Sequence, residues 1–145
     1  MSTPQPSPFR PDGRSMRERM EAGDPYIALD PELGALSTRA QQLTERYNAS
    51  SVTDTELRRE ILEDLLGEAG AEIEIRPPFR VDYGRYISIG PRTFANFGFT
   101  VLDIAPVRIG ADCQIGPNVQ LLTATHPLQP GPRRDRWEGS APITL

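Results

Sequence analysis

A six-residue repeat is the feature of this sequence that most restricts its fold. Ile109, Ile115 and Leu121 lie six residues apart, and glycine follows each of the two isoleucines. One hexad can form a short flat strand and a tight corner, so three hexads make a triangular coil with the aliphatic residues inside. Such a coil buries its apolar residues only against neighbouring coils, and the repeat therefore predicts a solenoid of stacked coils.

The six-residue step continues upstream of this run in a looser form. Ile89, Ala95, Val101 and Val107 keep the step, and a shift of two residues then separates Val107 from Ile109. The alternative fold is an ordinary antiparallel β domain with glycine turns. The strands of such a domain recur at about 8–12 residues, so the shorter period favours the solenoid.

Helical patterns precede the repeat. Asp30, Pro31 and Glu32 have the order of an N-cap, a first-turn proline and an acidic residue near the positive end of a helix. Apolar residues then recur at spacings of three and four, as on one buried helix face. These residues are Leu36, Ala40, Leu43 and Tyr47. Residues 53–56 (TDTE) are cap-like residues before another helical pattern, so the patterns predict two successive helices.

Composition narrows the class of protein further. The 145 residues carry a net charge of −4, which argues against binding dominated by nucleic-acid phosphates. The single cysteine, Cys113, excludes an internal disulfide framework and a cysteine-cluster metal site. The sequence shows no signal peptide and no stretch as apolar as a membrane span. We therefore expect a cytoplasmic protein with a disordered arm (1–14), a helical unit (15–70) and a mainly β unit (71–145).

Several motifs in combination resemble the maltose/galactoside O-acetyltransferase family of hexapeptide-repeat transferases. Residues 20–26 (MEAGDPY) and 30–33 (DPEL) resemble the helical cap of that family. Residues 94–97 (FANF), 123–128 (TATHPL) and 142–144 (PIT) resemble a first coil, the catalytic segment and the return to the coils. The resemblance implies a left-handed parallel β-helix preceded by a small α-helical cap of the maltose-acetyltransferase type.

The same resemblance implies a chemical activity. Members of this family transfer an acetyl group from acetyl-CoA to a sugar hydroxyl, in a cleft between two subunits of a homotrimer and without a metal ion. In the family, further coils follow the PIT motif and bind most of the coenzyme. The sequence here stops at Leu145, so we expect a β-helix that is incomplete at its C-terminus, and no residue is assigned to acetyl-CoA.

His126 is the candidate general base, and it is the only histidine in the chain. A sugar hydroxyl attacks well only as it loses its proton, and imidazole ionises close to neutral pH. An exposed loop histidine without a role is the other interpretation. Glu138 lies in the loop that returns to the coils, matches an acidic position of the family and is the candidate partner that orients His126. A solvated loop carboxylate is its alternative.

Four residues are candidates for acceptor binding. By resemblance, Asn96 contacts the acceptor and the reacting centre, whereas a corner asparagine in the left-handed conformation is the alternative. Asp82 matches an acceptor-facing position and could accept bonds from two vicinal hydroxyls, or could simply point outward from a half-buried strand. Tyr26 could close over the acceptor from the cap or belong to the core. Asp103 is a further acceptor-site candidate.

Two other functions remain compatible with the sequence. A truncated β-helix could be a catalytically inactive remnant, or a binding or scaffold module that acts through protein contacts. Acyl transfer to a non-sugar hydroxyl or an amine could use the same base, His126. The helical cap favours the sugar branch, so sugar O-acetylation is the function that the sequence predicts.

Overall fold

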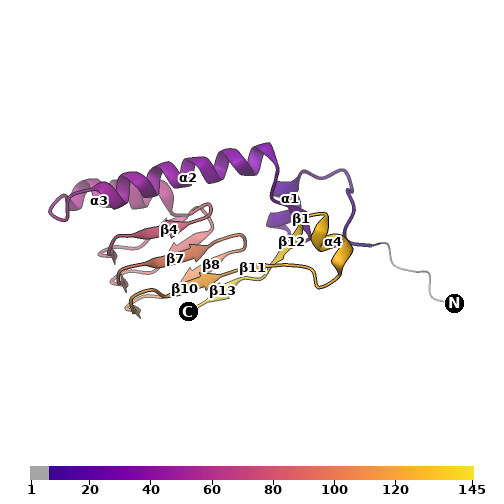
Figure 1. Cartoon of the computed structure of the whole chain (residues 1–145). Coiled ribbons are helices and arrows are strands. Elements are labelled where there is room, and N and C mark those ends of the chain that lie inside the picture. Colours follow the sequence, from indigo (N-terminus) through magenta and orange to yellow (C-terminus); the bar gives the residue numbers. More distant parts are fainter. Residues whose placement is uncertain (1–6) are drawn as a thin grey trace.

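The computed structural model describes residues 7–145, and stacked coils of short parallel strands form its centre (Figure 1). Each of the three coils contributes three strands. In chain order these are β2 (Glu68–Ala69), β3 (Glu74–Ile75), β4 (Phe79–Val81), β5 (Ile87–Ile89), β6 (Phe94–Ala95), β7 (Phe99–Leu102), β8 (Val107–Ile109), β9 (Gln114–Ile115) and β10 (Gln120–Leu122). The predicted stacking of coils is therefore confirmed.

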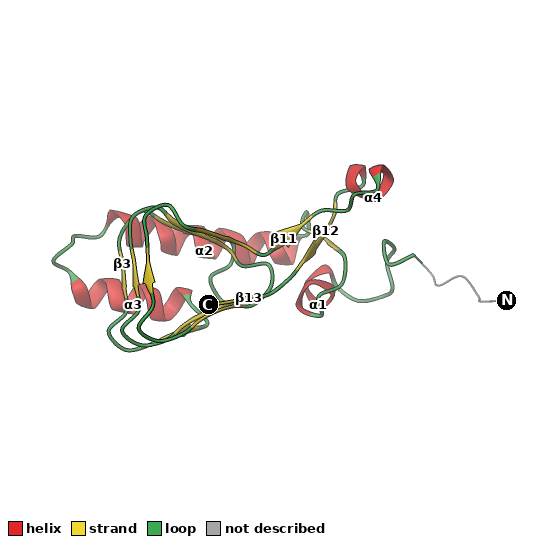
Figure 2. Ribbon diagram, turned by 90° about the horizontal axis from the view of Figure 1, so that it is seen from below, coloured by secondary structure: helices red, strands yellow, loops and turns green. Residues whose placement is uncertain are grey.

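The strands stack into three parallel sheets, one on each side of a triangle (Figure 2). The sheets have the orders β4-β7-β10, β3-β6-β9 and β2-β5-β8-β13, where β13 is Ile143–Thr144. Val101 pairs with both Val81 and Leu121, so equivalent positions in neighbouring coils lie 20 residues apart. A coil is thus two residues longer than three hexads, which accounts for the shift between Val107 and Ile109.

The aliphatic residues of the hexads point into the solenoid. Ile109, Ile115 and Leu121 are buried, as the repeat predicts. Phe79 and Phe99 add a stacked aromatic pair with ring centroids 5.7 Å apart. Burial of one large apolar side chain contributes about 1.5–3 kcal/mol relative to exposure, so these interior ladders are the main source of stability of the coils.

Three helices precede the coils: α1 (Met16–Glu21), α2 (Pro31–Ala49) and α3 (Thr55–Leu65). The Asp30 carboxylate accepts two backbone N–H bonds in the first turn of α2, and the Asp54 carboxylate caps α3. Both predicted helix starts are therefore confirmed. Two strands lie inside the range 15–70 that the sequence assigned to the helical unit: β1 (Tyr26–Ile27), and β2, which begins the coils at Glu68.

Helix α2 lies along the first coil, next to β4 (Figure 1). The Asn48 side chain accepts a hydrogen bond from the Phe79 N–H at 2.9 Å and donates one to the Phe79 carbonyl oxygen at 3.0 Å. The buried Tyr47 hydroxyl donates to the Ile75 carbonyl oxygen at 2.6 Å. An uncovered strand edge leaves backbone groups unpaired, and these side chains supply partners for the backbone of Phe79 and Ile75 in the first coil.

The expected disordered arm is described only in part, because residues 1–6 lie outside the described residues. Residues 7–14 contain no helix or strand, yet they have defined contacts. The buried Arg19 guanidinium donates to the Pro8 carbonyl oxygen at 2.8 Å and pairs with Asp12, also at 2.8 Å. Over the described part of the chain, no helix has the length and apolar character needed to cross a membrane.

Candidate functional site

An arm leaves the solenoid between β10 and β13, at the corner where the first two coils have only short turns. It contains β11 (Ala124–Thr125), α4 (Pro130–Arg134) and β12 (Trp137–Ser140). Strands β11 and β12 pair antiparallel, so the chain runs outward and returns as a hairpin (Figure 1). Strand β12 also pairs antiparallel with β1 (Tyr26–Ile27), which ties the arm to the helical region.

Local sequence explains where the arm starts and turns. The Thr123 hydroxyl is buried at the base of the arm, where it donates to the Leu102 carbonyl oxygen at 2.6 Å and accepts from the Ala105 N–H at 3.0 Å. Pro127 and Pro130 lack a backbone N–H and cannot extend a strand ladder. Pro130 instead starts α4. His126 therefore lies at the outer end of β11, clear of the solenoid.

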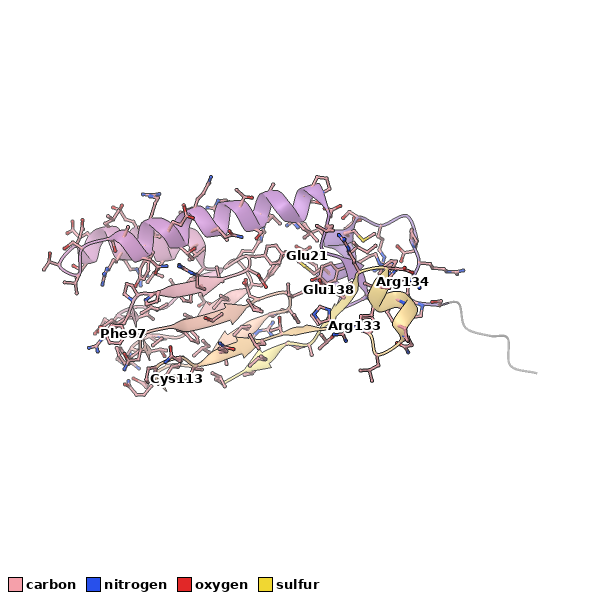
Figure 3. The ribbon with its side chains drawn as sticks, in the orientation of Figure 1. Glu21, Phe97, Cys113, Arg133, Arg134 and Glu138 are labelled. Carbon is pink, nitrogen blue, oxygen red and sulfur yellow. The ribbon has the colours of Figure 1, made fainter. Side chains whose placement is uncertain are left out.

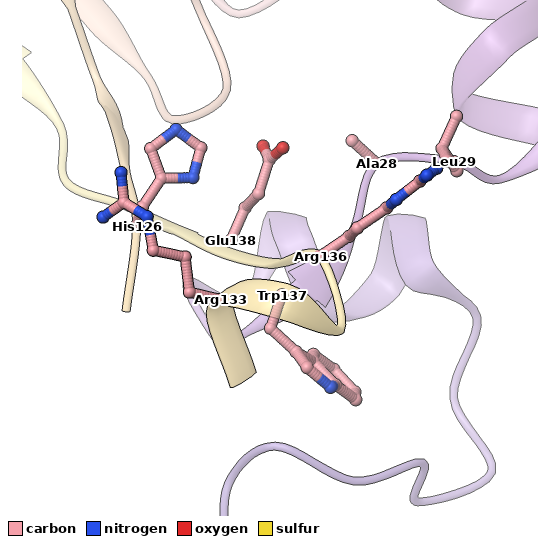
Figure 4. Close-up of a pocket in the computed structure, with 7 residues that line it drawn as sticks. All are labelled: Ala28, Leu29, His126, Arg133, Arg136, Trp137 and Glu138. Carbon is pink, nitrogen blue, oxygen red and sulfur yellow. The ribbon is translucent and has the colours of Figure 1, made fainter. Parts of the chain in front are cut away.

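A pocket lies where the arm meets the segment after β1 (Figure 4). Its lining residues are Ala28, Leu29, His126, Arg133, Arg136, Trp137 and Glu138. His126 is exposed, and its imidazole lies beside the Glu138 carboxylate in Figure 4. The structure therefore places the predicted base and its predicted partner in one pocket. The same pocket has two exposed guanidinium groups, those of Arg133 and Arg136.

Glu138 is half-buried and is held by Tyr26. The Tyr26 hydroxyl donates to Oε2 of Glu138 at 3.0 Å. Tyr26 is fully buried, and it packs in a cluster that includes Leu33 and Tyr83. Burial, together with the Glu138 carboxylate, raises the pKa of Tyr26 far above its ordinary value. Tyr26 thus belongs to the core, which is one of the two interpretations considered from the sequence, and its hydroxyl binds Glu138.

Asp82 follows β4 and is half-buried close to Glu138. Burial, together with the nearby Asp103 and Glu138 carboxylates, raises the pKa of Asp82 from 3.8 to about 6. An ionisable side chain with a raised pKa beside a pocket is typical of a functional site. The position agrees with the acceptor-binding role predicted from the sequence, and that role remains a prediction.

Replacing Asp82 with asparagine is expected to reduce the pH dependence of folding stability. The Asp82 carboxyl keeps its proton up to a pH of about 6 in the folded chain, but only up to about 4 when unfolded. A pKa raised by folding stabilises the protein at low pH, and this stabilisation is lost as the pH rises through 6. Between about pH 4 and 7.5 the free energy of unfolding should fall by about 1–3 kcal/mol more in the wild type than in the variant. Urea unfolding at both pH values measures this difference, and equal losses would contradict the assignment.

Asp103 is fully buried and binds backbone of the neighbouring corner. Its Oδ1 accepts from the N–H groups of Asp82 at 3.1 Å and Tyr83 at 2.8 Å, and its Oδ2 accepts from the Tyr86 N–H at 3.2 Å. Burial raises the pKa of Asp103, and the N–H groups of Tyr83 and Tyr86 act in the opposite direction. The carboxylate therefore organises the turn that contains Asp82, and the acceptor contact expected from the sequence remains a prediction.

Asn96 lies at a different corner of the coil, after β6. It is half-buried, and its Oδ1 accepts from the Phe97 N–H at 2.8 Å. The left-handed conformation considered for Asn96 occurs at Asn118 and not at Asn96. Figure 3 shows Phe97 at the opposite end of the solenoid from Glu138 and Arg133. Within one chain, Asn96 is therefore not brought into the pocket of His126.

Two lining residues carried no chemical signal in the sequence. Ala28 and Leu29 are apolar, and Leu29 is 70% exposed at the rim of the pocket. They reach the pocket because β1 pairs with β12, a contact that no local pattern predicts. Within residues 7–145, no cluster of three or more His, Cys, Asp or Glu side chains is arranged to hold a metal ion.

Comparison with known proteins gives matches along most of the chain. A family profile described as the maltose acetyltransferase hexapeptide capping motif matches residues 19–70. Nodulation protein L of Rhizobium meliloti is 40% identical over 132 residues, which cover 91% of this chain and 72% of that protein.

Two solved structures show the same similarity in three dimensions. A maltose O-acetyltransferase from Clostridium difficile 630 is 32% identical and superposes with a TM-score of 0.87, over 90% of this chain and 70% of that one. A hexapeptide-repeat-containing acetyltransferase from Vibrio cholerae O1 biovar eltor, in complex with acetyl coenzyme A, is also 32% identical. It superposes with a TM-score of 0.78 over 89% of this chain and 69% of that one.

Proposed function

Because this chain belongs to the maltose/galactoside O-acetyltransferase family of acetyl-CoA-dependent acetyltransferases, we propose that it acetylates a sugar hydroxyl with His126 as the general base. One observation carries the proposal: the only histidine lies beside Glu138 in a pocket between the arm and the helical region. The sugar is supported by the names of the maltose-specific profile and of the maltose O-acetyltransferase structure.

The proposed reaction needs one base and one orienting group from the described residues. His126 removes the proton from the sugar hydroxyl as the oxygen attacks the thioester carbonyl of acetyl-CoA. The carbon–sulfur bond of the tetrahedral intermediate then breaks, and His126 returns the proton to the departing thiolate. Glu138 holds the imidazole in the orientation that accepts the proton. In this proposal Asp82, whose pKa the nearby Glu138 carboxylate raises, receives a second hydroxyl of the acceptor.

The proposal includes a left-handed winding of the coils and a homotrimer that works in the cytoplasm. The hexad period and the family membership support the winding and the trimer, and the single cysteine suits a reducing compartment. In a trimer, the Asn96 corner of one subunit can lie against the His126 arm of the next. Sedimentation equilibrium of the purified chain tests the trimer, since a monomer mass contradicts it.

Release of free coenzyme A thiol tests the activity directly. The purified chain is mixed with acetyl-CoA and a panel of mono- and disaccharides, and the thiol is followed with a colorimetric reagent. We expect thiol release that requires both acetyl-CoA and a sugar, together with an acetylated sugar detected by mass spectrometry.

The same assay separates the other functions. Thiol release that is faster with amines or non-sugar hydroxyls than with sugars would show that the acceptor belongs to another class. Absence of release at high enzyme concentration, from a sample that circular dichroism shows to be folded, would favour the inactive remnant or the scaffold module.

A further inference from the structure

The hydrogen bond between Tyr26 and Glu138 joins two parts of the chain that are 112 residues apart. Tyr26 lies on β1 and Glu138 on β12, and the two residues are direct partners in the antiparallel register. The Tyr26 ring is fully buried, whereas its hydroxyl reaches the carboxylate at the pocket wall. The helical region therefore contributes a polar contact to the pocket without exposing the side chain that makes it.

The surroundings of Glu138 make this donor important. The Asp82 carboxyl lies near Glu138, and the Asp103 and Glu138 carboxylates both raise the pKa of Asp82. Hydrogen-bond donors stabilise a half-buried carboxylate that lies near other carboxylates, as do opposite charges such as the Arg133 and Arg136 guanidinium groups of the same pocket. Tyr26 keeps its proton because burial raises its pKa, so its hydroxyl is a permanent donor to Glu138.

The backbone of β12 is also held on the face opposite Glu138. Trp137 is buried there, with the Arg19 guanidinium 5.3 Å from its ring centroid and the Phe9 ring 6.2 Å away. These contacts fix the strand but do not touch the Glu138 carboxylate. The orientation of the carboxylate therefore depends on the Tyr26 hydroxyl, which is its hydrogen-bond donor in the described part of the chain.

We propose that Tyr26 is a positioning residue that holds Oε2 of Glu138 and thereby directs the other carboxylate oxygen to His126. This inference rests on the proposed roles of His126 and Glu138. Tyr26 does not touch the substrates. It acts by holding the carboxylate in one orientation, so that the imidazole in turn presents one nitrogen to the acceptor hydroxyl.

Replacing Tyr26 with phenylalanine removes the hydroxyl and keeps the buried ring. Tyr47→Phe is the matched control, because Tyr47 is equally buried and also donates one hydrogen bond, to the Ile75 carbonyl oxygen away from the pocket. We expect Tyr26→Phe to lower kcat about tenfold, with KM for both substrates within about twofold, since misorientation affects the chemical step more than binding. Tyr47→Phe should leave kcat within about twofold.

A second measurement does not depend on turnover. Because the chain has one histidine, the ¹⁵N chemical shifts of a histidine-labelled sample report the tautomer of His126 alone. We expect one dominant tautomer in the wild type and in Tyr47→Phe. In Tyr26→Phe the tautomer populations should move toward those of Glu138→Gln, in which no carboxylate orients the ring.

The two measurements separate the inference from the proposed function. If the wild type transfers no acetyl group, the proposed function fails, and the tautomer measurement still tests the role of Tyr26. The inference is overturned if Tyr26→Phe matches Tyr47→Phe in both kcat and tautomer populations. It is also overturned if KM rises while kcat is unchanged, because that result places Tyr26 in substrate binding.

Discussion

Replacing His126 with alanine is expected to lower kcat for acetyl transfer by a factor of about 10²–10⁴, the usual contribution of a general base. No second histidine can take over the proton. The side chain is exposed at the end of β11, so its loss should leave the fold intact. Initial rates of thiol release at saturating acetyl-CoA and sugar measure the effect.

A matched control for this experiment lies on the same arm. Gln129 is exposed just before α4 and does not line the pocket. Gln129→Ala should therefore keep the wild-type rate. Unfolding midpoints of both variants should agree with that of the wild type. An unchanged rate in His126→Ala contradicts the proposed mechanism, because the transfer would then proceed without the base.

Replacing Asp103 with alanine is expected to lower the free energy of unfolding by about 3 kcal/mol or more. The change leaves the backbone N–H groups of Asp82, Tyr83 and Tyr86 without their acceptor. A buried donor that loses its partner costs about 1–3 kcal/mol; the Tyr83 N–H is buried, the other two are partly buried, and all three lose their acceptor together. Urea denaturation followed by circular dichroism measures the loss.

The comparison for Asp103 is an exposed aspartate. Asp64 lies on α3 and pairs with Arg39 at the surface, where ion pairs are worth about 0–1 kcal/mol. Asp64→Ala should therefore change the free energy of unfolding by no more than about 1 kcal/mol. If Asp103→Ala is equally mild but raises KM for the sugar, Asp103 binds the acceptor, as the sequence suggested, and the structural role is wrong.

Much of the fold could be predicted from the sequence because its signals are local. The caps at Asp30 and Asp54 depend on neighbours one to three residues away. The aliphatic step through Ile109, Ile115 and Leu121 reflects the geometry of one strand and one corner. These rules hold wherever the segment lies in space, so the helices and the stacked coils follow from the chain alone.

The site was predictable only in part. The choice of His126 as the base needed no structure, since the chain has one histidine. Asp82, Asp103 and Asn96 are equally polar in the sequence, yet Asp103 binds backbone and Asn96 lies at another corner. Residue type does not distinguish them. The role of each residue depends on which corner of the coil it occupies and on which part of the neighbouring coil or of the arm packs against that corner.

The sequence by itself determined the period of the coils, the starts of the helices and the identity of the only histidine base. Only the tertiary structure decided that the arm folds back on β1, that Tyr26 holds Glu138 and that Ala28 and Leu29 line the pocket. The physical reason is distance along the chain. Tyr26 and Glu138 are 112 residues apart, and the stacking of the coils between them sets where their side chains meet.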